Sequence, residues 1–99
     1  MEEPLYDPEI ISKMVVSIGD VSKITEVPIR QLRYWEEKKI ITSVAESEGK
    51  TRRFDYANIK KVLLIKELLD EGYTLEASVK KVEDRMKNLN EAFKMLREK

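Results

Sequence analysis

The sequence predicts a mostly α-helical fold that includes one small β-hairpin. Two short helical segments stand about four residues apart, the helical period disappears between Thr42 and Asp55, and apolar residues follow a heptad repeat after Thr74. Together these three patterns predict a winged helix-turn-helix whose wing is the hairpin, followed by a long C-terminal dimerisation helix.

Composition limits the chemistry of this chain. It has 99 residues, of which 41% are hydrophobic and 38% charged, which suits one domain with a small core and long amphipathic helices. It contains neither cysteine nor histidine, so disulfides, thiolate metal sites and catalysis by either residue are excluded. Carboxylates remain as general bases, and they fall on solvated helix faces without a convergent partner. We therefore expect no enzyme activity, no cofactor and no metal.

The charges balance overall but are unevenly distributed. Lysine plus arginine and aspartate plus glutamate each number 19, and a formal net charge of +0 argues against a non-specific polyanion binder. Residues 28–56, however, carry seven basic and five acidic side chains, while residues 1–16 carry four acids and one lysine. No apolar run approaches the roughly 20 residues of a membrane span, and no signal-peptide pattern begins the chain. We expect a cytoplasmic protein without a membrane partner.

Residues 1–16 are expected to form an N-terminal arm with one short helix. Asp7 and Pro8 predict an N-cap and a proline at the first helical position. Ile10, Ile11 and Met14 would share one side of this helix. Because so short a helix is not stable alone, it should either fray or dock on another surface.

Residues 17–73 are expected to form the winged helix-turn-helix. Ser17 and Asp20 resemble a capping box, and the helix that follows has Ile18, Val21 and Ile24 on one face. It should end before Pro28, because the residue preceding a proline is disfavoured in the α region. The next helix starts at this proline and carries the segment RQLRYWEEKKI.

That second helix separates into two sides when its residues are projected at about 100° each. Leu32 marks the packing side, shared with Ile29, Trp35 and Glu36. The opposite side holds Arg30, Arg33, Tyr34 and Glu37, with Gln31 at the margin. Arginine and tyrosine suit phosphates and guanine edges, and glutamine suits an adenine edge. Trp35 is expected to brace the helix against the core and to offer its indole N–H to a phosphate, while residues 36–39 form a solvated flank.

The wing is expected between Thr42 and Asp55. The segment ESEGK forms its turn, and Arg52 and Arg53 lie on or beside the returning strand. Asp55 then caps a helix that ends at Gly72 in the C′ position. The apolar stripe of this helix is Ile59, Val62, Ile65 and Leu69.

Residues 74–99 are expected to form one long helix capped by Thr74. Its heptad positions are Leu75, Val79, Val82, Met86, Leu89, Phe93 and Leu96. A helix of about 25 residues extends beyond so small a core. We therefore expect its distal part, residues 86–96, to pair with a second copy in a symmetric dimer, helped by residues 7–14.

These residues resemble the MerR family of bacterial transcription regulators. The matching segments are SIGDVSKIT, RQLRYWEEKKII and TRRFDYANIKKVLLIKELLDEGYTLE, within residues 17–76. The resemblance implies a homodimer that binds a palindromic promoter site in double-stranded DNA, with the RQLRYW helix in the major groove and the wing on the flanking backbone. The RQ-RY-EE variant resembles the nitrogen-control repressor subgroup that regulates glutamine synthetase. In that subgroup an N-terminal helix also contributes to the dimer.

The resemblance assigns roles by position. Tyr34 and Trp35 take the places of paired aromatics that meet phosphate, and Arg52 and Arg53 take those of wing arginines. The candidate DNA-binding residues are Arg30, Gln31, Arg33, Tyr34, Trp35, Lys50, Arg52 and Arg53. The candidate dimerisation residues are Ile10, Ile11, Met14, Met86, Leu89, Phe93 and Leu96.

Three departures from the family pattern stand out. Glu26, Val27 and Pro28 replace the usual glycine, apolar residue and serine or threonine cap, so the turn lacks that cap. Trp35 replaces a tyrosine. The sequence ends at Lys99 without an effector-binding domain, so we expect regulation through a protein partner or through a segment outside this sequence.

A second hypothesis uses the same elements differently. The heptad repeat also suits a coiled-coil interaction or architectural protein, in which the winged helix is a protein-docking or nucleoid-anchoring module. Selection of bound sites from random DNA separates the two, because the second hypothesis predicts no enriched sequence.

Overall fold

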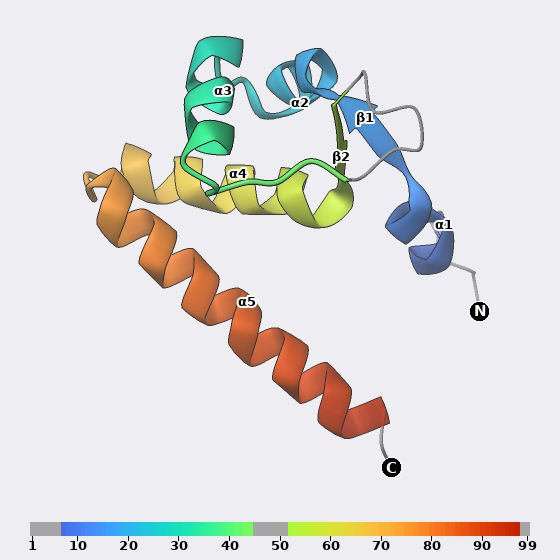
Figure 1. Ribbon diagram of the computed structural model, residues 1–99. Helices are drawn as coiled ribbons and strands as arrows, with labels where there is room; N and C mark the ends of the chain where they lie inside the picture. The colour runs from blue at the N-terminus through green and yellow to red at the C-terminus, as the bar shows by residue number, and fades with distance from the viewer. Residues whose placement is uncertain (1–6, 45–51, 98–99) are drawn as a thin grey trace, which may run out of the picture. The chain divides into compact units, whose positions relative to one another are not determined.

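The computed structural model describes residues 7–44 and 52–97 of the chain (Figure 1). These residues form five helices and two short strands, which confirms the mostly α-helical class. In chain order they are α1 (Pro8–Lys13), β1 (Val15–Ser17), α2 (Ile18–Thr25), α3 (Ile29–Glu37), β2 (Arg53–Asp55), α4 (Tyr56–Asp70) and α5 (Leu75–Arg97). The chain divides into two compact units, residues 1–63 and 64–99.

Side-chain caps set the starts of four helices, at the positions that the sequence predicted. Asp7 accepts from the Glu9 amide at 2.8 Å, and Ser17 accepts from the Asp20 amide at 3.2 Å. The other two caps join Asp55 to the amide of Asn58, and Thr74 to the amide of Ala77, each at 3.1 Å. Each cap satisfies an amide that has no partner within its own helix.

The sheet differs from the expected simple hairpin. Val44 does pair with Arg53 in an isolated antiparallel bridge, as a wing requires. The longer partner of β2, however, is β1, with Val15 opposite Asp55, Val16 opposite Phe54 and Ser17 opposite Arg53. Residues 15 and 16, assigned to the arm from sequence, thus form a strand beside the wing (Figure 1). The turn segment ESEGK lies outside the described residues.

The core of the first unit is built from α2, α3, β2, α4 and the segments on either side of α3. Its buried apolar side chains are Val21, Val27, Leu32, Trp35, Ile41, Phe54 and Val62. Ile24 and Ile29, both expected on packing faces, are exposed. Thr25 is buried instead of Ile24, because its hydroxyl donates to the Val21 carbonyl at 2.7 Å and accepts from the Val27 amide at 3.3 Å. Its polar group therefore enters the core with its hydrogen bonds satisfied.

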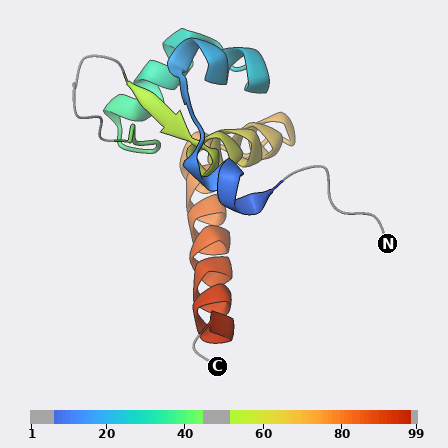
Figure 2. The same ribbon diagram turned by 90° about the vertical axis from the view of Figure 1, so that its right-hand side faces the viewer.

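The second unit contains the end of α4, a tight turn and α5. Gly72 adopts φ 104, and the amides of Gly72 and Tyr73 donate to the carbonyls of Leu69 and Leu68. This pair of bonds is a Schellman motif and confirms the expected glycine C′ position. Ile65 and Val82 are buried in this unit, and α5 is one continuous helix (Figure 2). None of the described helices is apolar over a length that would cross a bilayer.

Candidate nucleic-acid interface

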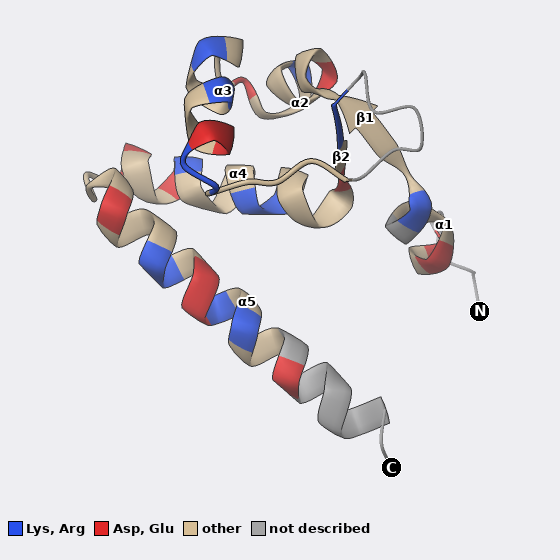
Figure 3. Cartoon of the chain, viewed as in Figure 1, with Lys and Arg blue, Asp and Glu red and all other residues tan. Residues whose placement is uncertain are grey.

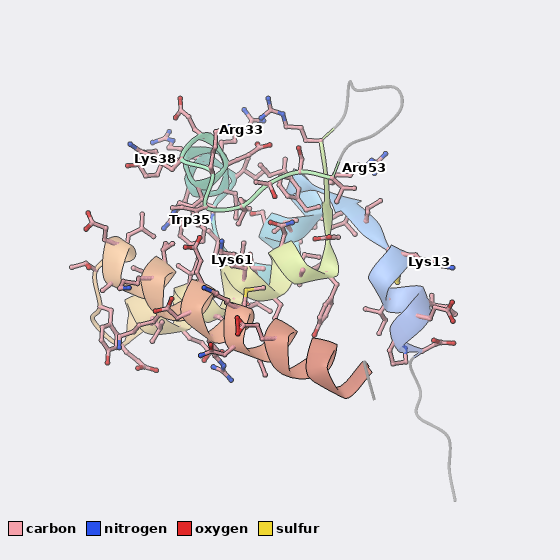
Figure 4. The ribbon with its side chains drawn as sticks, turned by 60° about the horizontal axis from the view of Figure 1, so that its bottom comes forward. Lys13, Arg33, Trp35, Lys38, Arg53 and Lys61 are labelled. Atoms are coloured by element: carbon pink, nitrogen blue, oxygen red, sulfur yellow. The ribbon has the colours of Figure 1, made fainter. Side chains whose placement is uncertain are left out.

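The α3 helix presents one cationic face to solvent. Arg30, Gln31, Arg33 and Tyr34 are all exposed, whereas Leu32 and Trp35 are buried. Figure 4 views α3 nearly along its axis and shows Arg33 and Trp35 on different sides of it. This separation follows from the helical period, because residues two positions apart point in nearly opposite directions. Lys38 adds a further cation, with its Nζ atom 5.6 Å from the centre of the Tyr34 ring.

Trp35 requires a correction to the candidate set. Its side chain is 1% exposed, and its Nε1 atom has no hydrogen-bond partner among the described residues. The indole therefore packs in the core, as the projection predicted, but presents no surface to a phosphate. We remove Trp35 from the candidate DNA-binding residues and assign it to the core, on the buried side of α3.

Two non-glycine residues with positive φ flank α3. Glu26 adopts φ 63 in the turn before the helix, and Lys39 adopts φ 64 after it. The amides of Lys39 and Ile40 donate to the carbonyls of Glu36 and Trp35, which ends α3 in a Schellman motif. At the other end Pro28 supplies no side-chain cap. The turn lacks that cap, as the sequence indicated, and the Ser22 hydroxyl instead donates to the Val27 carbonyl at 2.7 Å.

The wing arginine Arg52 lies against α3. Its Nη1 atom is 2.7 Å from Oε1 of Glu36, and the two side chains are 68% and 11% exposed respectively. The sequence suggested that residues 36–39 form a solvated flank. Glu37, Lys38 and Lys39 are indeed exposed, but Glu36 is not part of that flank. A depression of about 510 Å³ is lined by Arg33, Glu36, Glu37, Ser43 and Arg52. The structure thus brings Arg33 and Arg52 together.

The segment after α3 is anchored to α4 through one side chain. The Thr42 amide donates to Oδ1 of Asn58 at 3.0 Å, and Nδ2 of Asn58 donates to Oδ1 of Asp55 at 2.9 Å. This contact fixes the backbone at Thr42, and the next residue, Ser43, lines the depression. Sequence reasoning missed Asn58, and the only available signal was its position three residues after a capping aspartate.

Two candidate DNA-binding residues remain to be placed. Arg53 is half-buried on β2, between its partners Val44 and Ser17. Lys50 lies outside the described residues. Basic residues occur on both α3 and the segment leading into β2 (Figure 3), and the described residues hold no cluster of acidic side chains that would bind a metal.

The candidate dimerisation residues are largely accessible where they are described. Ile10, Met14 and Leu89 are 58%, 55% and 50% exposed, while Ile11 and Met86 are half-buried. The side chains of Phe93 and Leu96 lie outside the described set, although both positions belong to α5. These exposed apolar side chains have little cover within the single chain.

A helix-turn-helix with a wing strand and two exposed arginines on its second helix is typical of a class of nucleic-acid-binding regulators. The chain belongs to the MerR helix-turn-helix family, since the family described as MerR HTH family regulatory protein matches residues 16–85. This match confirms the resemblance inferred from sequence. The narrower assignment to a nitrogen-control subgroup stays a prediction.

Named relatives agree with this assignment. The chain is 38% identical over 60 residues to the HTH-type transcriptional regulator TnrA of Bacillus subtilis (strain 168), covering 61% of this chain and 54% of TnrA. It is 37% identical over 81 residues to the HTH-type transcriptional regulator GlnR of Bacillus anthracis, covering 82% of this chain and 61% of GlnR. The chain therefore spans less than two thirds of either relative. Both are transcriptional regulators by name rather than enzymes.

A solved structure supports the fold. The crystal structure of a MerR family transcriptional regulator from Bacillus cereus matches with a TM-score of 0.64 and 16% identity, covering 84% of this chain and 67% of the other. At this identity the likeness concerns the fold alone.

Proposed function

We propose that this chain is a sequence-specific DNA-binding transcriptional regulator that binds a palindromic promoter site as a homodimer. The observation that carries the proposal is the shared depression, in which Arg33 of the helix-turn-helix and Arg52 of the wing lie together beside the exposed face of α3. Exposed arginines on a helix and on the neighbouring wing match a major groove bordered by phosphates.

In this proposal α3 enters the major groove. The groove of B-form DNA is about 12 Å wide and admits one helix. Arg30 and Arg33 contact guanine edges or nearby phosphates, and Gln31 contacts an adenine edge. Tyr34 donates its hydroxyl to a phosphate, while Arg52 and Arg53 contact the flanking backbone. Arginines that neutralise phosphates release counterions, so these contacts would supply the salt-dependent part of the affinity.

A homodimer would place two such helices on two half-sites. Exposed apolar side chains support the dimer: Leu89 on α5, and Ile10 and Met14 in and after α1. Covering such side chains with a partner lowers the free energy of the complex. A two-fold symmetric protein requires a palindromic site. Such a regulator would act at the nucleoid in the cytoplasm, with a protein effector as the expected source of regulation.

Binding across a salt series tests the proposal. Random-site selection first supplies the bound duplex, and titrations then follow its affinity between about 50 and 200 mM salt. We expect the logarithm of the affinity to fall linearly with the logarithm of salt, by roughly 0.9 for each phosphate contact. An Arg52→Gln variant should reduce this slope by about one for each protomer. Wild-type affinity that is indifferent to salt would contradict the mechanism.

The alternative function is a coiled-coil or architectural module that uses the winged helix for docking or nucleoid anchoring. The half-exposed Leu89 also suits this role. The same selection distinguishes the two, since only the first function enriches a palindromic sequence.

A further inference from the structure

The contact between Arg52 and Glu36 joins the wing to the recognition helix within the first unit. The two residues are 16 positions apart, and Nη1 of Arg52 donates to Oε1 of Glu36 at 2.7 Å. The Glu36 side chain is mostly buried, at 11% exposure, and a buried carboxylate requires a charged or hydrogen-bonding partner, which Arg52 supplies. Arg52 is 68% exposed, so one end of its guanidinium is fixed while most of the group faces solvent.

An arginine held in this way keeps donors for a second ligand. The guanidinium carries five N–H donors in a planar fork, and the contact with Glu36 engages one nitrogen. The other nitrogens remain able to bind an anion in bidentate geometry. A free arginine side chain loses considerable rotamer entropy when it binds, whereas one that is already ordered loses less.

We infer that Glu36 is a positioning residue for DNA binding, which holds Arg52 ready for a backbone phosphate next to the groove occupied by α3. This inference rests on the proposed function. Glu36 itself touches no DNA in this arrangement. It fixes the distance between the phosphate contact of the wing and the base contacts of α3, so the wing and α3 bind the same DNA site together.

A positioning role for Glu36 and simple electrostatics predict opposite effects on DNA binding when Glu36 is removed. A carboxylate beside a polyanion opposes binding, so its removal alone should strengthen the complex. If Glu36 positions Arg52, its removal should weaken the complex instead. Glu37 is the matched control, because it is the neighbouring acid, lines the same depression and is exposed.

The experiment compares Glu36→Met with Glu37→Met on the duplex recovered by random-site selection. Each variant removes one negative charge from each protomer and keeps the length of the side chain. We expect Glu36→Met to weaken binding by about two- to tenfold for each half-site, the cost of ordering one side chain. Glu37→Met should bind as tightly as the wild type or more tightly. Equal or tighter binding by Glu36→Met would overturn the inference.

Two further variants separate positioning from folding. Glu36→Gln loses the same charge as Glu36→Met but keeps an acceptor oxygen for Arg52, so it should recover part of the lost affinity. In an Arg52→Gln background, Glu36→Met should no longer weaken binding, because the side chain that it positions is gone. Should Glu36→Met fail to fold, Glu36→Gln is compared with Glu37→Gln instead. Glu36→Gln should weaken DNA binding, whereas Glu37→Gln should leave it unchanged or strengthen it.

The outcomes also separate this inference from the function on which it rests. A wild-type chain that enriches no DNA sequence overturns both. A wild-type chain that binds its selected site, together with additive effects of Glu36→Met and Arg52→Gln, overturns the positioning role alone.

Discussion

At the residue scale, Arg33 should have a large effect on recognition. It is exposed on α3 and lines the depression shared with Arg52. We expect Arg33→Ala to weaken binding to the selected duplex by roughly 1–3 kcal/mol if Arg33 contacts a base. Titration against a scrambled duplex provides the control, because loss of a base contact reduces discrimination between the two duplexes. An equal loss on both would assign Arg33 to a phosphate instead.

Glu26 stores conformational strain in the turn of the helix-turn-helix. Its φ of 63 lies in the left-handed region, where a side chain costs about 1–2 kcal/mol and glycine costs little. Glu26→Gly should therefore raise the free energy of unfolding by about 0.5–1 kcal/mol, after allowing for the extra entropy of glycine in the unfolded chain.

Urea denaturation measures this change directly. Lys23→Gly is the control, because Lys23 is exposed inside α2, and glycine there should destabilise by about 1 kcal/mol. Two substitutions of the same kind, three positions apart, thus have opposite signs. A loss of stability in both variants would show that the strain at Glu26 is negligible.

Residue-level features were predictable from sequence where their causes are local. The capping residues Asp7 and Ser17 act on amides two or three positions away, and the sequence alone indicates such contacts. The pairing of Glu36 with Arg52 spans 16 positions and depends on how the wing folds back. The projection placed Glu36 within about 60° of Leu32, which was the available signal, but its charge favoured a solvated interpretation.

At the element scale, the turn between α4 and α5 depends on one glycine. Gly72 adopts φ 104, and an added Cβ atom would meet nothing within 4 Å. Gly72→Ala should therefore destabilise the second unit by about 1 kcal/mol or more through backbone strain alone. Thermal unfolding followed by circular dichroism measures the change. Glu71→Ala, at the exposed neighbouring position, should leave stability nearly unchanged.

Strand β1 was the element that sequence analysis missed. The three residues of β1 are too few for an alternating pattern, and Ser17 already carried a strong helix-capping signal. Helix α2, in contrast, starts and ends where the sequence predicted, because a cap and a proline mark its two sides. Elements with local end signals were predicted, and the pairing of distant strands was not.

At the scale of the whole molecule, the oligomeric state is the main open prediction. Leu89 is half-exposed on α5, so its replacement should disturb a partner contact more than the folding of the single chain. We expect light scattering at micromolar concentration to give twice the chain mass of 11.6 kDa for the wild type. Leu89→Lys should shift the mass toward that of one chain, whereas Lys87→Ala should not. A monomeric wild type would contradict the proposed dimer.

The pairing of β1 with β2 also determines the chain topology of the first unit. Val16 and Phe54 are paired although they stand 38 positions apart (54 − 16), so α2 and α3 lie within one closed loop. Closing such a loop costs about 3 kcal/mol of chain entropy, which the three residue pairs and the burial of Phe54 must offset. We therefore expect the helices to form early during folding and the sheet to form late. Removal of residues 1–16 would keep all residues of α2 and α3. It would remove the pairs of Val15 with Asp55 and of Val16 with Phe54, and with them most of the closure of the loop that contains both helices.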